Sequence, residues 1–142
     1  MYDVFRSLTG APARAVDAAS IDPGQLPYRR DDNFSATLTY DDGSLAHLMY
    51  TALGPKGLAK ERIEIFCDGE TYIVDDFRKL TKGSDGSVMW QSSDTDKGHF
   101  EELSRFGDAI AAGGASPISF DELFETSAVA LRVDDILFGR SE

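Results

Sequence analysis

Cysteine is nearly absent from this chain, because Cys67 is the only one among its 142 residues. No intrachain disulfide can therefore form, and no group of Cys and His has the spacing of a zinc site. No stretch approaches the ~20 consecutive apolar residues of a membrane span. No basic segment leads into an apolar run near the first residue. These absences predict a soluble, cytoplasmic protein.

Basic residues are scarce as well. Lys and Arg together number 14 against 25 Asp and Glu, which gives a formal net charge of −11. A surface for nucleic acid or for an anionic membrane needs clustered cations, so the composition argues against both partners. With 142 residues, 42% of them hydrophobic, the chain is long enough for one compact hydrophobic core and too short for two cores of ordinary size. This predicts a single domain over residues 1–142.

The sequence motifs of common catalytic sites are missing. There is no Gly-x-Gly-x-x-Gly or Walker loop, no Gly-x-Ser-x-Gly elbow and no His-Glu-x-x-His pair. Adjacent aspartates such as Asp75 and Asp76 point to opposite faces of a strand, so turn chemistry explains them better than paired-carboxylate catalysis. By itself the sequence predicts no catalytic residue, no cofactor-binding residue and no metal site.

What the chain does contain is a pair of hairpin signals between residues 32 and 75. The turns Asp42-Gly43 and Asp68-Gly69 each separate two segments with alternating apolar and polar residues. Asp-Gly favours a tight hairpin because such a turn needs a positive φ, which Gly adopts freely. Two hairpins in series, joined by the link 54–60, predict an antiparallel meander.

The first turn also predicts which side chains share a face. If Asp42-Gly43 is the tip, Tyr40 lies opposite Leu45. One face would then be apolar and consist of Phe34, Ala36, Leu38, Tyr40, Leu45, His47, Met49 and Thr51. The other would consist of Ser35, Thr37, Thr39, Ala46, Leu48, Tyr50 and Ala52.

This second face carries no Lys or Glu, which favours a surface covered by another subunit. The alternative is a solvent face that is rich in Thr because Thr suits strands. The first interpretation predicts a homo-oligomer, most simply a dimer, formed through the open face of the sheet.

Helical periodicity marks both ends of the chain. Residues 2–8 are predicted to form a helix that ends at Gly10. No capping residue precedes this helix, which suggests a chain cut from something longer. After Ser92, apolar residues recur every three to four positions, with Asp94 or Asp96 as candidate cap. The apolar residues of that helix are Phe100, Leu103, Phe106 and Ile110, before Gly113 and Gly114.

A capping box of Ser119 and Glu122 starts the last helix, which we expect over residues 120–138. Its inward side is predicted to include Leu123, Phe124, Ser127 and Leu131. Further strands are expected over 13–20, 78–81 and 88–91. The whole pattern predicts an α+β fold in which helices, two of them C-terminal, pack on one face of an open, mainly antiparallel β-sheet.

Two histidines are the remaining candidates for chemistry. His47 falls on the predicted apolar face, where a packed or edge residue is the better interpretation, since it lacks an orienting partner. His99 and Lys97 flank Gly98 at a helix start, where free N–H groups favour an anion or polar ligand. The alternative is that Lys97 and His99 are ordinary exposed residues of a first turn.

Several segments together resemble the C-terminal domain of the Gfo/Idh/MocA oxidoreductases, and most closely the bi-domain, dehydrogenase-fused branch. The matching segments are residues 32–46, 50–54, 60–69, 75–77, 96–103 and 117–119, so the resemblance extends over nearly the whole chain. It implies an α+β domain whose open sheet helps to shape a substrate site and to form oligomers. In such enzymes an N-terminal Rossmann domain binds NAD or NADP.

The chain departs from the family's full pattern. The glycine-rich fingerprint and the Glu-Lys-Pro segment with the family's catalytic Lys are missing. The family's His-x-x-Asp signature places its Asp at Asp3, and its His would fall just before Met1. The resemblance therefore implies a domain that binds no cofactor alone, with Asp3, Lys97 and His99 as substrate-binding residues.

By this resemblance the chain is the substrate-binding and oligomerisation domain of an NAD(P)-dependent oxidoreductase, inactive alone, that acts on a sugar, sugar derivative or cyclitol. The alternative is a free-standing, non-catalytic binding or dimerisation module that uses the same sheet fold.

Overall fold

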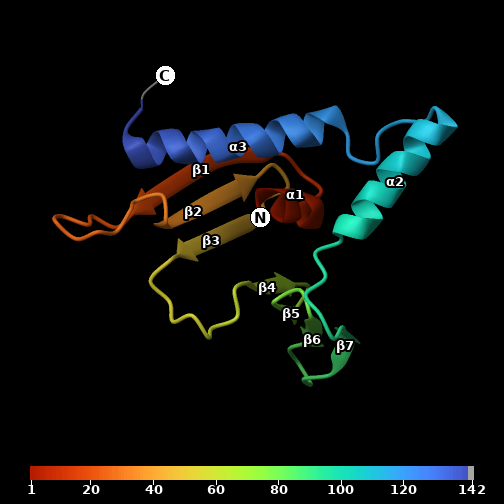
Figure 1. Ribbon diagram of the computed structural model, residues 1–142, viewed down its shortest axis with the longest axis horizontal. Coiled ribbons are helices and arrows are strands. Elements are labelled where there is room, and N and C mark those ends of the chain that lie inside the picture. Colours follow the sequence, from red (N-terminus) through yellow and green to blue (C-terminus); the bar gives the residue numbers. More distant parts are fainter. Residues whose placement is uncertain (141–142) are drawn as a thin grey trace. The chain divides into compact units, whose positions relative to one another are not determined.

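The computed structural model describes residues 1–140 and has three helices and seven strands in that range (Figure 1). In chain order they are α1 Tyr2–Thr9, β1 Ala13–Ser20, β2 Asn33–Tyr40, β3 Leu45–Thr51, β4 Arg62–Cys67, β5 Glu70–Asp75, β6 Lys79–Lys82, β7 Val88–Gln91, α2 His99–Ala112 and α3 Phe120–Phe138. The predicted α+β class is confirmed, and two helices are C-terminal. None of the described helices has the length and apolar character needed to cross a membrane.

The chain forms two compact units. The first unit contains Met1–Gly54 and the chain from Ala115 onward, and the second contains Pro55–Gly114. Each has its own antiparallel sheet, in the order β1-β2-β3 in the first unit and β4-β5-β6-β7 in the second. The predicted meander is therefore divided between two sheets at the link 54–60, where Pro55 cannot donate to a ladder and glycines weaken strand pairing. That residues 1–142 act as one domain stays a prediction.

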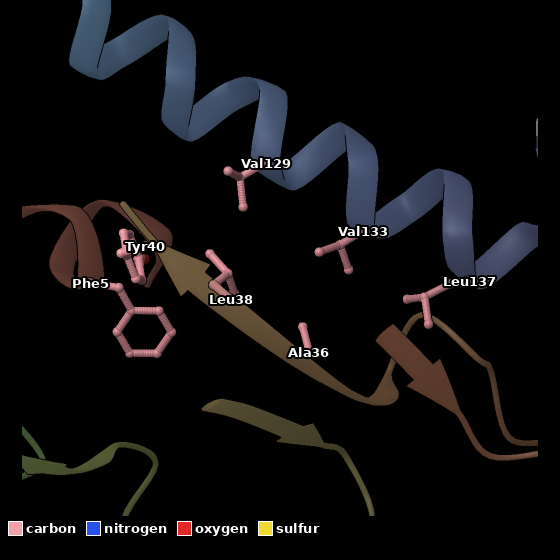
Figure 2. Close-up of a cluster of buried hydrophobic side chains, with 7 residues drawn as sticks. All are labelled: Phe5, Ala36, Leu38, Tyr40, Val129, Val133 and Leu137. Carbon is pink, nitrogen blue, oxygen red and sulfur yellow. The ribbon is translucent and has the colours of Figure 1, made fainter. Parts of the chain in front are cut away.

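The core of the first unit lies between β2 and α3. In Figure 2, Val129, Val133 and Leu137 project from successive turns of α3 towards the buried side chains of β2. The buried cluster consists of Phe5, Ala36, Leu38, Tyr40, Val129, Val133 and Leu137. Ala36, Leu38 and Tyr40 are each only 1% exposed, and their period of two is the period of a strand with one covered face.

The first hairpin closes through three residues and not through two. Tyr40 N–H donates to Ser44 O at 2.9 Å, and Gly43 N–H donates to Tyr40 O at 3.0 Å. Gly43 has φ 88°, the left-handed conformation that follows a type I turn in a three-residue hairpin. Asp42 stabilises this form because its carboxylate accepts from the N–H and hydroxyl of Ser44 at 2.9 and 2.8 Å.

The additional turn residue shifts β3 by one position and exchanges its faces. Thr39 pairs with Leu45 and Leu38 pairs with Ala46, so the predicted pairing of Tyr40 with Leu45 is wrong. The predicted apolar face was therefore right for β2 and wrong for β3. Leu45, His47, Met49 and Thr51 lie beside Thr39, Thr37, Ser35 and Asn33, while Ala46, Leu48 and Tyr50 lie beside Leu38, Ala36 and Phe34.

The second hairpin closes as its sequence predicts. Cys67 pairs with Glu70, so Asp68 and Gly69 form a two-residue turn, with φ values of 50° and 77°. Both central residues have the positive φ that a type I′ turn requires. The same Asp-Gly signal therefore gives a three-residue loop at Asp42-Gly43 and a two-residue turn at Asp68-Gly69.

The helix ends are partly as predicted. Gly10, Gly113 and Gly139 follow the three helices in the left-handed conformation. On α3 the capping box is confirmed, since Ser119 accepts from Glu122 N–H at 3.2 Å and Glu122 accepts from Ser119 N–H at 3.0 Å.

Two expectations about the helices are wrong. The N-cap of α2 is Gly98, without a side-chain cap bond, because the Asp96 carboxylate accepts from Gly98 N–H at 2.9 Å and lies before the helix. On α3 the expected inward residues Leu123, Phe124 and Leu131 are 51%, 66% and 66% exposed. The helix has apolar residues on more than one side, so periodicity alone does not identify the face that meets the sheet.

Glu125 connects three elements of the first unit. Its carboxylate lies 2.8 Å from Arg6 Nε on α1 and accepts from Ala13 N–H on β1 at 2.6 Å. The Arg6 and Glu125 side chains are only 19% and 21% exposed, so both partners are shielded from water. An acceptor placed in this way satisfies a backbone donor and a guanidinium together.

Glu125→Gln is expected to lower the free energy of unfolding by about 1–3 kcal/mol, because charge-assisted hydrogen bonds are worth more than neutral ones. Urea unfolding followed by far-UV circular dichroism measures the loss. Asp121→Asn, an exposed change in the first turn of the same helix, is the matched control and should cost less than about 1 kcal/mol. Equal losses for the two variants would show that Glu125 acts only through general helix electrostatics.

Candidate functional site

The second unit contains an open pocket of about 580 Å³. Three segments line it: the link before β4, the turn between β5 and β6, and the segment that leads to α2. The lining residues are Gly57, Leu58, Ala59, Lys60, Glu61, Asp76, Arg78, Thr95 and Lys97. A volume in this range suits a ligand of sugar to nucleotide size.

The turn from β5 to β6 forms one wall and holds an unusual backbone. Asp76 and Phe77 have φ values of 51° and 50°, and Arg78 N–H donates to Asp75 O at 2.9 Å. Positive φ is tolerated by Asp but costs a bulky residue such as Phe about 1–3 kcal/mol. Strain of this kind gathers at functional sites, which makes the turn a candidate part of one.

Lys97 is held against this wall. Its Nζ lies 2.5 Å from Glu61 Oε1 and 5.5 Å from the centroid of the Phe77 ring, a cation–π contact. The second carboxylate oxygen of Glu61 is buried and has no hydrogen-bond partner among the described residues. Asp76 N–H donates to Glu61 O at 2.7 Å, so the link and the turn are joined by backbone as well.

The segment before α2 closes the other side. Thr95 donates its hydroxyl to Asp76 Oδ2 at 3.3 Å, and Asp96 N–H donates to Phe77 O at 3.0 Å. The guanidinium of Arg78 donates to Ser93 O. These bonds place one carboxylate, one hydroxyl and one guanidinium around the same opening.

The predicted substrate-binding residues have different positions. Lys97 lines the pocket, whereas His99 begins α2 two residues later and is exposed outside the lining. Asp3 belongs to the first unit, on α1, where its side chain is 71% exposed. That the three residues share one cleft stays a prediction.

Asp3 has a pKa below its usual value. Burial alone would raise the pKa of Asp3, but the hydrogen bond and the charge of the Met1 ammonium, 2.9 Å away, outweigh burial. Backbone hydrogen bonds lower the pKa further.

His47 lies on the face of β3 opposite to the predicted one. It is exposed, and its Nδ1 lies 3.0 Å from the hydroxyl of Thr37, its cross-strand neighbour. The expectation that it belongs to the packed apolar face is wrong, because of the three-residue turn.

Sequence reasoning missed Lys60, Glu61, Asp76, Arg78 and Thr95 as pocket residues. The expectation that Asp75 and Asp76 do not act as a pair is confirmed, because they bind different partners. Asp75 lies 3.1 Å from Arg62, whereas Asp76 accepts from Thr95. The hydrogen bonds that assemble the pocket join residues 15 to 36 positions apart, and no local motif encodes these contacts.

The side chains and strand directions of residues 1–140 bear on metal and dinucleotide binding. No group of three or more His, Cys, Asp and Glu side chains there could hold a metal ion. Every strand pairing in the two sheets is antiparallel. A dinucleotide is bound where parallel strands lead through a glycine-rich turn into a helix, and these residues do not fit one.

Comparison with known proteins shows the fold. No protein-family model matches the sequence, and no curated protein matches it. Several solved structures match nearly all of the chain. UDP-N-acetylglucosamine 3-dehydrogenase from Acidithiobacillus ferrooxidans has 21% identity and a TM-score of 0.75, over 96% of this chain and 45% of that one.

Two further structures are similar in extent. Aldose-aldose oxidoreductase from Caulobacter crescentus, complexed with glycerol, has 13% identity and a TM-score of 0.73, over 98% of this chain and 43% of that one. An oxidoreductase from Agrobacterium radiobacter, in complex with NAD+, L-tartaric acid and magnesium, has 18% identity and a TM-score of 0.66. That match extends over 98% of this chain and 45% of that one.

The chain thus spans less than half the length of the solved oxidoreductases that it matches. At these identities the matches show a shared fold. The resemblance to Gfo/Idh/MocA-type oxidoreductases is confirmed at this level, and the extent of the matches is consistent with their C-terminal domain.

Proposed function

We propose that the chain serves as the substrate-binding and oligomerisation domain of an NAD(P)-dependent oxidoreductase that acts on a sugar, sugar derivative or cyclitol. The observation that carries the proposal is the match of almost the whole chain to less than half of several oxidoreductases. Two of these are named for a nucleotide sugar and for aldoses, which supports a polyhydroxylated substrate.

The pocket of the second unit supports the substrate-binding role. Lys97 is oriented by Glu61 and Phe77, which lowers the entropy that it loses when it binds a ligand. We propose that Lys97, with His99 and Asp3, contacts the substrate in the complete enzyme. Redox chemistry is assigned to a separate nucleotide-binding domain, and this chain alone is expected to be inactive.

The open face of the β1-β2-β3 sheet supports the oligomerisation role. Leu45 and Met49 are each 72% exposed there, beside the hydroxyl side chains of β2. Exposed apolar side chains grouped on one flat surface are typical of protein interfaces. We propose that two copies of the chain pair through this face in the cytoplasm as a homodimer.

The isolated chain is expected to bind neither NADH nor NADPH, because its strands offer no phosphate cradle. NADH fluorescence, titrated with up to high micromolar protein, measures binding. The Agrobacterium radiobacter oxidoreductase, which has been seen with NAD+, is the positive control. Saturable micromolar binding by this chain would contradict the proposed division of labour between two domains.

A further inference from the structure

We propose that the pocket of the second unit takes an acidic group of its ligand, a carboxylate or a phosphate, with Arg78 and Lys60 as the opposing charges. The inference rests on the proposed function, since it names the chemical class of the substrate. A polyhydroxylated acid or a sugar phosphate would satisfy it, and a neutral sugar would not.

The charges that line the pocket support an anion. Three lining side chains are basic and two are acidic, in a chain whose formal net charge is −11. Glu61 already neutralises Lys97, whereas Asp76 keeps its negative charge while it accepts from Thr95, so the three basic and two acidic lining side chains sum to a formal charge of +1. This leaves Arg78 and Lys60, for which the described part of the chain shows no carboxylate within ion-pair distance. A positive opening in a negative protein concentrates anions.

Arg78 has the geometry for this role. Its guanidinium donates to Ser93 O, which fixes one end of the group, and further N–H donors remain for a ligand. A guanidinium matches the two oxygens of a carboxylate or a phosphate with paired hydrogen bonds. The turn that carries Arg78 is held by backbone hydrogen bonds from Asp76 N–H to Glu61 O and from Asp96 N–H to Phe77 O.

Lys60 adds a second cation from another of the lining segments. It lines the pocket from the link before β4, beside Gly57, Leu58 and Ala59. Thr95 and Asp76 also line the pocket and offer polar atoms for ligand hydroxyls. A neutral sugar would cover Arg78 and Lys60 without supplying a counter-charge, and the desolvation of these cations disfavours it.

Isothermal titration of the chain as it exists tests the inference, with D-gluconate, glucose 6-phosphate and D-glucose as probes at constant ionic strength. Gluconate or glucose 6-phosphate should bind at least about tenfold more tightly than glucose, and the tighter of the two identifies carboxylate or phosphate. Arg78→Gln should weaken the anion by at least about tenfold. Lys60→Gln should weaken it as well, and provides a second variant if Arg78→Gln disturbs the turn.

Arg105→Gln, which removes the same charge from α2 outside the pocket lining, is the matched control and should bind as the wild type does. Failure of both anions to bind would overturn the inference. Equal binding of glucose, unaffected by either pocket variant, would also overturn it, yet would leave a sugar-binding role standing. The proposed function is tested by a different measurement, the NADH titration, and saturable NADH binding by this chain would contradict it.

Discussion

Leu38→Ala is expected to lower the free energy of unfolding by about 2–5 kcal/mol, the range for a leucine truncated in a closed core. Leu38 is 1% exposed on the central strand β2 and lies beneath Val129 and Val133 of α3 (Figure 2). The lost methyl groups leave a cavity between a sheet and a helix, which cannot both move inward to fill it. Urea unfolding followed by far-UV circular dichroism measures the loss.

Leu45→Ala is the matched control, because the same atoms are removed from the neighbouring strand. Leu45 is 72% exposed, so its truncation should change the free energy of unfolding by no more than about 0.5 kcal/mol at concentrations where the chain is monomeric. A two-residue turn at Asp42-Gly43 would instead place Leu45 in the core. A loss of several kcal/mol for Leu45→Ala would therefore contradict the three-residue turn.

Met49→Lys is expected to convert the proposed homodimer to a monomer. Met49 is 72% exposed on the open face of the first sheet, so lysine fits there without disturbing the fold. Across a two-fold axis the new charge would have to be desolvated in both copies, which should weaken the dimer at least about 100-fold. Size exclusion with light scattering measures the mass against protein concentration, and Thr37→Lys on the same face should behave alike.

Leu26→Lys provides the control for this change. Leu26 is 60% exposed between β1 and β2, away from the paired residues of the open face, so the same substitution should leave the mass unchanged. A wild-type chain that stays monomeric at high micromolar concentration rules the interface out. Dissociation by Leu26→Lys to the same degree would point to a general effect of charge.

Local signals in the sequence were sufficient for most of the elements. Capping groups and glycines act within one or two turns of the chain, so Ser119 with Glu122, Gly10 and Gly113 could be interpreted directly. The turn at Asp68-Gly69 closed as its dipeptide predicts. Alternation along β2 correctly identified Ala36, Leu38 and Tyr40 as core residues, because one side of the strand is strictly apolar.

Local sequence signals could not predict the register between β2 and β3. Asp42-Gly43 can close a loop of two or of three residues, and the hydrogen bonds from Ser44 to Asp42 accompany the longer loop. A single residue then exchanged the faces of β3 and moved Leu45 and Met49 from the expected core to the surface. The choice between two apolar sides of α3 was likewise made by packing on the sheet, which uses Val129 and Val133.

The sequence by itself determined the α+β class, the antiparallel hairpins and the absence of a phosphate-binding motif, since each depends on residues close together in the chain. Only the tertiary structure decided which residues surround the pocket. Glu61 and Lys97 are 36 positions apart, and Asp76 and Thr95 are 19 apart. Such pairs meet because three segments are held together by the strained turn at Asp76 and Phe77 and by the backbone hydrogen bonds around it. No local sequence pattern predicts these contacts.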